Sequence, residues 1–348
     1  MTAALDLGSH TFRSLRGTND KLVARSVRPV CVILPDNALH QRRLEKLGLG
    51  HSRCDAHLVL LGDAAIEFSR PFEVPCTDLL PGGVVSSHDS LSHQFLEVLL
   101  SAVLPQSAYP GEKCSFTQPG STLRGSSARQ PSRVRQTEIF DRLIRQRGYA
   151  PNSVTAGEAL ALAELVESRF SGIALVMGAA NCEITVMQGG HGLSHGSIPM
   201  GGSTVDEQFA RERGDCCTDV LGRQVPNVAQ ARRDKEQFSN VLTAPASRDE
   251  KLLGRIYRQF VLDTAAGLAR HLAKGQFPEF RQPTTLVLGG GSATMPGVFE
   301  ILAEHVQRPG FPVKIDRVQA ATAPYAVARG CLIHAELEAQ SQSLRSAA

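Results

Sequence analysis

Three glycine-containing turns, each directly after a short apolar run, constrain this chain of 348 residues more than any other feature. They occupy residues 6–11, 177–181 and 289–292. Glycine lets a backbone approach a phosphate closely, so that its N–H groups can point at the phosphate oxygens. Three such turns in this order and spacing indicate two related half-domains that close on a ligand carrying phosphates.

The composition argues against several classes of protein. The net charge of +3 is too small and too dispersed to favour nucleic-acid binding, and tryptophan is absent. The eight cysteines contain no C-x-x-C pair, so we expect reduced thiols, no zinc site and a cytoplasmic protein. Apolar runs fall short of the ~20 residues that a membrane span needs. Residues 95–100 fit a core helix, with a peripheral membrane face as the alternative.

Strand-like runs alternate with helical stretches, which predicts an α/β protein. We expect strands at residues 30–33, 57–61, 114–117, 173–176, 184–187 and 285–288, and helices at 91–104, 136–147, 158–170 and 251–274. Residues 118–135 are almost free of apolar side chains and are predicted to form a flexible basic loop. Residues 341–348 are predicted to be a polar tail.

The first turn suggests a magnesium and phosphate site. Asp6 ends an apolar stretch, and its carboxylate can hold magnesium directly or through water. The turn that follows, Gly8 to Thr11, offers N–H groups and hydroxyls to phosphate oxygens. An ordinary hairpin turn that contains an aspartate is the alternative. Further along, Gly201 and Gly202 open a helix, with Asp206 in its first turn.

Together, these motifs resemble the actin-like ATPase superfamily, and within it the chain is most similar to the bacterial actin homologues of the MreB type. The resemblance rests on residues 61–65, 81–85, 201–206, 290–297 and 326–330. It implies two α/β domains of the ribonuclease-H-like type, with ATP and magnesium in a central cleft. Domain I would comprise residues 1–150, with 318–340 returning to it, and domain II residues 151–317.

The resemblance also assigns roles to residues. Asp6 would bind the magnesium ion. The phosphates would face Gly8, Ser9, His10, Gly178 and Asn181. The nucleoside would lie against Gly201, Gly202, Asp206, Lys235, Gly290, Gly291 and Ser292. Lys235 falls where relatives place a lysine that contacts adenine, although a solvated helix face explains it equally simply.

Glu158 is the candidate catalytic residue, together with Asp6. It falls where MreB-like proteins carry a glutamate that orients the attacking water, and a carboxylate there could accept a proton. The spacing Thr155-x-x-Glu158 also fits a capping box, in which Glu158 binds the backbone N–H of Thr155. Both interpretations remain open from the sequence.

Two departures from the family pattern affect the expected activity. Relatives carry a metal-binding aspartate where this chain has Val176, and valine can neither bind a metal nor accept a proton. Few residues separate Ser239 from Leu252, where MreB-like proteins insert a small subdomain, so domain II carries a reduced insertion. We therefore expect weak nucleotide binding and slow or absent hydrolysis.

Three functions fit these observations. The first is an MreB-like cytoskeletal protein that binds ATP, self-associates into filaments and organises cell shape or the cell interior, with membrane proteins as further candidate partners. The second is a non-polymerising adaptor with a degenerate nucleotide site. The third is an exopolyphosphatase-like phosphohydrolase, because residues 6–13 also resemble that family. This third function would need an intact second phosphate turn, and Val176 disrupts that turn.

Overall fold

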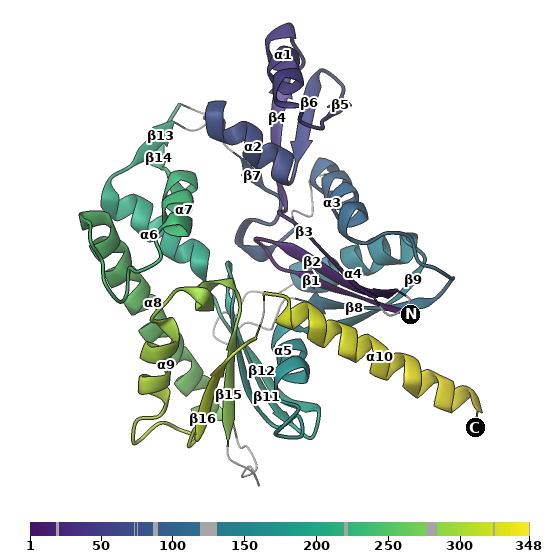
Figure 1. Ribbon diagram of the computed structural model, residues 1–348, viewed down its shortest axis with the longest axis vertical. Coiled ribbons are helices and arrows are strands. Elements are labelled where there is room, and N and C mark those ends of the chain that lie inside the picture. Colours follow the sequence, from purple (N-terminus) through teal and green to yellow (C-terminus); the bar gives the residue numbers. More distant parts are fainter. Residues whose placement is uncertain are drawn as a thin grey trace.

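The computed structural model describes residues 1–18, 21–72, 74, 76–85, 90–118, 131–218, 222–275, 284–322 and 324–347. Two five-stranded sheets dominate this part of the chain, each with helices packed against it (Figure 1). Both sheets have separate hydrophobic cores, and a third cluster of apolar side chains joins them. The molecule is therefore built from two α/β halves.

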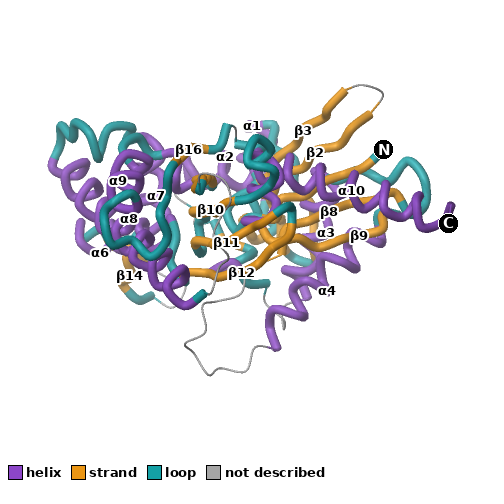
Figure 2. Tube along the Cα trace, turned by 90° about the horizontal axis from the view of Figure 1, so that it is seen from below, coloured by secondary structure: helices purple, strands orange, loops and turns teal. Residues whose placement is uncertain are grey.

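The first sheet has the strand order β3-β2-β1-β8-β9. Its strands are β1 (Thr2–Leu7), β2 (Phe12–Thr18), β3 (Lys21–Val27), β8 (Glu112–Gln118) and β9 (Tyr149–Thr155). The first three strands form an antiparallel meander, whereas β8 pairs parallel to β1 and β9 parallel to β8. The helices α3 (Ser90–Val103), α4 (Pro131–Gln146) and α10 (Ala326–Ala347) pack on this sheet. Figure 2 shows β2 and β3 extending beyond the neighbouring strands.

The second sheet repeats this topology, with the order β12-β11-β10-β15-β16. Its strands are β10 (Gly172–Met177), β11 (Cys182–Gln188), β12 (His191–Ile198), β15 (Thr285–Gly289) and β16 (Arg317–Ala320). Again an antiparallel meander is followed by two parallel strands. The helices of this half are α5 (Ala156–Glu164), α6 (Gly202–Arg213), α8 (Arg248–Lys274) and α9 (Val298–Val306). Ser247 and Glu250 start α8 with a capping box.

Two smaller units project from the halves. A four-stranded sheet contains β4 (Val30–Pro35), β5 (Ser52–Cys54), β6 (His57–Leu61) and β7 (Thr77–Asp78), with α1 (Ala38–Leu47) and α2 (Asp63–Phe72) beside it. This sheet has its own core. On the other half, a ribbon of β13 (Cys216–Thr218) and β14 (Gln224–Pro226) precedes α7 (Val228–Gln237). Short 3-10 turns lie at η1 (Pro81–Gly83) and η2 (Gly291–Thr294).

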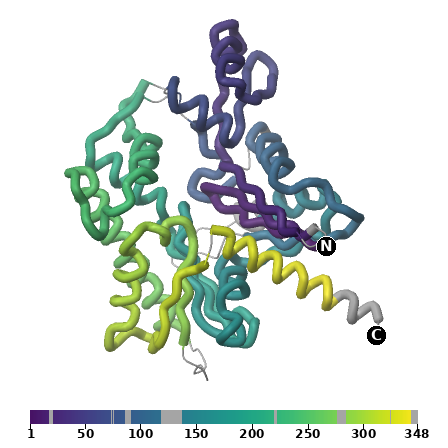
Figure 3. Tube along the Cα trace, in the orientation of Figure 1, coloured from purple at the N-terminus to yellow at the C-terminus, as the bar shows by residue number. Residues whose placement is uncertain are grey.

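The two halves meet where α10 crosses α5. Gly330 of α10 lies so close to α5 that a Cβ atom would overlap the carbonyl oxygen of Ala159. Ala4, Leu160, Val287 and other buried side chains from both halves fill this seam. Figure 3 shows yellow α10 running along the purple first strands. α5 follows β9 of the first sheet and α10 follows β16 of the second, so the chain passes between the halves at this packed crossing.

Several sequence-based boundaries differ from the structure. β9 continues to Thr155, so the predicted end of domain I at residue 150 falls inside a strand. β16 belongs to the second sheet, so the predicted return to domain I at residue 318 also falls inside a strand. Of the loop predicted at 118–135, residues 119–130 lie outside the described residues, while 131–135 are helical. The tail predicted from residue 341 continues α10 to Ala347, because it contains helix-forming residues and no Gly or Pro.

The possible membrane features are also accounted for. Within the described residues, no helix is long and apolar enough to cross a membrane. In the run at 95–100, the side chains of Phe95, Leu96, Leu99 and Leu100 are buried in the core of the first half. This run is therefore a core helix, and its apolar face is not free to contact a membrane.

Candidate functional site

The three glycine turns meet at one cavity of about 920 Å³ between the two sheets. The turn between β1 and β2 and the turn between β10 and β11 supply residues from both halves, and η2 supplies the third turn. Every predicted site residue lines this cavity except two. Those that line it are Asp6, Gly8, Ser9, His10, Gly178, Asn181, Gly202, Asp206, Lys235, Gly290, Gly291 and Ser292.

The turn after β1 and the turn after β10 lie beside one another at the floor of the cleft. In the second turn, the N–H of Gly178 donates to the carbonyl of Asn181 over 2.9 Å, which closes a tight four-residue turn. Gly83 of η1 has a φ of +79°, and a Cβ there would come within 3.0 Å of Ala180 and 3.9 Å of Ser9. η1 therefore packs against both turns at a point where only glycine fits easily.

The start of α6 supports the second turn instead of facing the cleft with free N–H groups. The N–H of Gly202 donates to the carbonyl of Gly178 over 3.0 Å, and that of Ser203 to Ala179 over 2.9 Å. A side chain at Gly201 would clash with the Ala179 carbonyl. Gly201 is one of the two predicted residues that do not line the cavity, and its role is this close packing.

The third turn packs in the same way. Gly290 has a φ of +95°, and a Cβ there would clash with the carbonyl of Met177. Ser292 donates from its hydroxyl to the carbonyl of Gly178 over 2.9 Å, which ties this turn to the second one. Gly291 differs from its neighbour, because a Cβ there would meet no atom within 4 Å. Gly291 is therefore the position of this turn that faces open space.

Asp6 lies on the cleft side of β1, paired across the ladder with Arg13 of β2. Its Oδ2 lies 3.6 Å from Nη1 of Arg13. Burial raises the pKa of the Asp6 carboxyl, while the charge of Arg13 and hydrogen bonds from Arg13 and Thr117 oppose that rise. Arg13, which was not among the site residues predicted from the sequence, also lines the cleft and contributes a positive charge beside the turn between β1 and β2.

Glu158 is the second predicted residue outside the cavity. Its Oε2 accepts hydrogen bonds from the N–H and the hydroxyl of Thr155 over 3.1 and 3.0 Å, and its own N–H donates to Thr155. Its Oε1 lies 3.3 Å from Nε2 of His195 on β12. Among the described residues that line the cleft, α5 contributes Ala156 and not Glu158. The capping box is confirmed, and the catalytic role of Glu158 stays a prediction.

We expect replacement of Glu158 with alanine to cost about 1 kcal/mol of stability, because the first turn of α5 loses its capping box. Nucleotide affinity and any release of phosphate from ATP should stay at the wild-type level. Thr155→Ala is the matched control, since it removes the other half of the same capping box. A loss of phosphate release in Glu158→Ala but not in Thr155→Ala would support the catalytic interpretation instead.

Val176 lines the cleft at the position where relatives carry an aspartate, and only 8% of it is exposed. Directly across the ladder, β11 places Glu183, which is 7% exposed and also lines the cleft. Glu183 was not among the site residues predicted from the sequence. The spacing could have indicated it, since Glu183 follows Val176 by as many residues as Arg13 follows Asp6.

Lys235 of α7 reaches the cleft, but its ammonium is held by the protein. Its Nζ lies 2.6 Å from Oδ1 of Asp206 and donates to the carbonyl of Gly202 over 3.1 Å. Asp206 is almost fully buried, and also lies 3.3 Å from Nε of Arg232. Asp206 therefore anchors two cations of α7. Contact between Lys235 and adenine stays a prediction.

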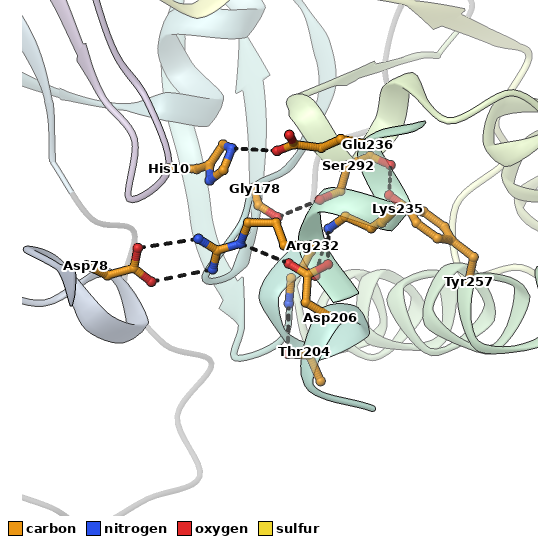
Figure 4. A network of polar contacts seen from close by, with 12 residues as sticks. His10, Asp78, Gly178, Thr204, Asp206, Arg232, Lys235, Glu236, Tyr257 and Ser292 are labelled. Carbon is orange, nitrogen blue, oxygen red and sulfur yellow. Dashed lines mark hydrogen bonds and ion pairs between the residues drawn. The ribbon is translucent and has the colours of Figure 1, made fainter. Parts of the chain in front are cut away.

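The helix α7 spans the cleft mouth through two sets of ion pairs, which we call the α7 bridge (Figure 4). Arg232 pairs with both carboxylate oxygens of Asp78 on β7, over 3.3 and 3.4 Å. Glu236 lies 3.5 Å from Nε2 of His10 and 3.2 Å from Nη2 of Arg28. Because His10 belongs to the turn between β1 and β2, the bridge connects that turn to the second half.

The α7 bridge should make the free energy of unfolding depend on pH in the acidic range. A hydrogen bond from His10 lowers the pKa of Glu236 from 4.5 to about 2, with the charge of Arg28 adding to it against partial burial. A carboxyl with a lowered pKa stabilises the fold above its unfolded value and loses that effect as pH falls towards 2. We therefore expect Glu236→Gln to destabilise the protein at pH 6 and progressively less between pH 4.5 and 2.

Chemical denaturation at several pH values measures this difference. Glu207→Gln, which removes an exposed carboxylate of α6, is the matched control. A difference between wild type and Glu236→Gln that stays constant down to pH 2 would contradict the proposed bridge.

The carboxylates of the cleft fit a magnesium ion only when phosphates complete its shell. Within the described residues, no group of three or more His, Cys, Asp or Glu side chains could hold a metal ion by itself. Asp6 and Glu183 both line the cleft. Magnesium takes oxygen ligands and is commonly held by one or two carboxylates plus the phosphates of a substrate. The donor set therefore fits this ion.

Comparison with solved structures identifies the fold. A chain of the MamK double helical filament aligns with a TM-score of 0.70 at 17% identity, over 97% of this chain and 99% of that one. MreB5 of Spiroplasma citri bound to AMPPNP gives 0.67 at 13% identity, over 98% of both chains. EutJ from Carboxydothermus hydrogenoformans gives 0.50 at 13% identity, over 95% of this chain and 88% of that one. The fold is thus the two-domain actin-like ATPase fold, and the predicted fold class and resemblance are confirmed.

A family model gives the family of the chain. The model of the volactin family matches residues 1–335, and the chain belongs to that family. No curated protein matches the chain.

Proposed function

We propose that this protein is a nucleotide-binding actin-like protein that assembles into filaments. The observation that carries the proposal is the cleft of about 920 Å³, which turns from both halves line with glycine, serine and backbone groups. MreB5, which shares the fold, is bound to AMPPNP, and MamK, which also shares it, forms a double helical filament. The chain carries both halves of this fold in full, with the same strand order repeated.

In this proposal, ATP with magnesium is the ligand. The turns at Gly8–His10 and Gly178–Asn181 would face the phosphates, and Gly291 and Ser292 the nucleoside. Magnesium would neutralise phosphate charge. Val176 removes one carboxylate from the phosphate end, so hydrolysis would be slow. Filaments of such a protein would serve cell shape or the organisation of the cell interior.

Sedimentation tests the proposal, with pellets inspected by electron microscopy. We expect the purified protein to pellet as filaments with ATP and magnesium, and to stay in the supernatant without nucleotide. Protein that remains monomeric in every nucleotide state and salt condition would overturn filament assembly. That result would favour a non-polymerising adaptor, the alternative to which Val176 points.

A further inference from the structure

The two hairpins at the floor of the cleft repeat each other residue by residue. β1 and β2 pair Asp6 with Arg13, while β10 and β11 pair Val176 with Glu183. The first residue of each pair lies two positions before the turn glycine, Gly8 or Gly178. Directly opposed residues of an antiparallel pair share one face of the sheet, with Cβ atoms about 5 Å apart. Arg13 and Glu183 therefore occupy equivalent positions in the two halves.

In the first hairpin this arrangement brings both side chains into the cleft. Arg13 and Asp6 approach to 3.6 Å, and both line the cavity. In the second hairpin Val176 and Glu183 also both line the cavity. A carboxylate at either position of the second pair thus reaches the same part of the cleft.

The charges at the floor of the cleft explain why a second carboxylate matters. Asp6 lies beside the guanidinium of Arg13, which offsets its negative charge. Val176 contributes no charge. A divalent cation prefers a site with negative oxygen ligands, and Glu183 is a further carboxylate that lines the same cavity.

We propose that Glu183 replaces the carboxylate that this site lacks at position 176, and that with Asp6 it holds the divalent cation that accompanies the nucleotide phosphates. This proposal rests on the proposed binding of nucleotide. Compared with an aspartate at position 176 on β10, the carboxylate of Glu183 lies one strand away, on β11, and on the same face of the sheet. No new backbone arrangement is required, because the register of β10 and β11 already aligns the two positions.

Binding of ATP to wild type and Glu183→Gln, with magnesium and with EDTA, tests the proposal by titration of a fluorescent ATP analogue. With magnesium, Glu183→Gln should bind about tenfold or more weakly, since it loses a cation ligand. With EDTA, the variant should bind more tightly than wild type, because a negative charge beside the phosphates is gone. A residue that only supports the fold would weaken binding under both conditions.

The variant Val176→Asp supplies the second arm. In the Glu183→Gln background, it should restore most of the increase in ATP affinity that magnesium gives. Introduced alone, it should make that increase larger and raise the release of phosphate from ATP. Val176→Asp on its own keeps the test available even where Glu183→Gln does not fold. If magnesium raised the ATP affinity of Glu183→Gln as much as that of wild type, the proposed role of Glu183 would be overturned. The same would follow if the variant lost equal affinity for ATP with magnesium and with EDTA. Either result would leave the proposed function standing. No binding by wild type in either condition would overturn the proposed function as well.

Discussion

Replacing Gly291 with tyrosine is expected to abolish nucleotide binding while leaving the fold intact. Gly291 lines the cleft, and a Cβ there would meet no protein atom within 4 Å, so a large side chain would occupy the space proposed for the nucleoside. For wild type, a nucleotide at about 100 times its dissociation constant should add about 2.7 kcal/mol to the free energy of unfolding. The variant should show no such gain.

Thermal unfolding with and without ATP measures this effect. Gly50→Tyr is the matched control, because Gly50 is exposed, also has open space around it and lies outside the cleft. Gly290 would be a poorer choice, since its positive φ and its contact with Met177 would make any side chain costly to the fold itself. An equal gain from ATP in wild type and Gly291→Tyr would show that nucleotide does not occupy this part of the cleft.

Replacing Gly330 with valine is expected to destabilise the whole molecule by more than about 3 kcal/mol, a large share of the stability of a typical domain. A Cβ at Gly330 would overlap the backbone oxygen of Ala159, which cannot move aside as a flexible side chain could. α10 would have to separate from α5, and the shared seam that includes Leu160 and Val287 would open. The two halves would then lose their packed connection.

Urea unfolding followed by circular dichroism measures the cost. Gly50→Val provides the control for adding a β-branched side chain at a glycine with space around it. A free energy of unfolding for Gly330→Val within about 0.5 kcal/mol of wild type would contradict the crossing of α5 and α10 described above.

The glycine turns were predictable from sequence because their signals are local. An apolar run followed by glycine predicts a strand and a turn, and Gly8, Gly178 and Gly291 all line the cleft. The alternation of strands and helices also predicted the α/β fold correctly. Two strands of the small sheet, β4 and β6, were predicted, but their pairing into a separate sheet was not, because these strands pair across an inserted helix and periodicity does not reveal such partners.

The chemistry of the cleft was harder to predict because it depends on orientation and register. Glu158 starts a helix at the expected place, but Gly157 packs against Thr185 and Glu158 turns to His195 on β12. A family position alone could not give that rotation. Glu183 becomes a cleft residue only through its pairing with Val176, which the tight turn between β10 and β11 fixes. The α7 bridge joins residues more than 150 positions apart.

Titration calorimetry of the wild-type protein with ATP and magnesium tests whether this cleft binds a nucleotide. We expect saturable binding of one ATP per chain. The absence of any binding heat at millimolar ATP across several temperatures would contradict nucleotide binding, and with it the proposed filament assembly and the proposed role of Glu183, which both depend on an occupied cleft.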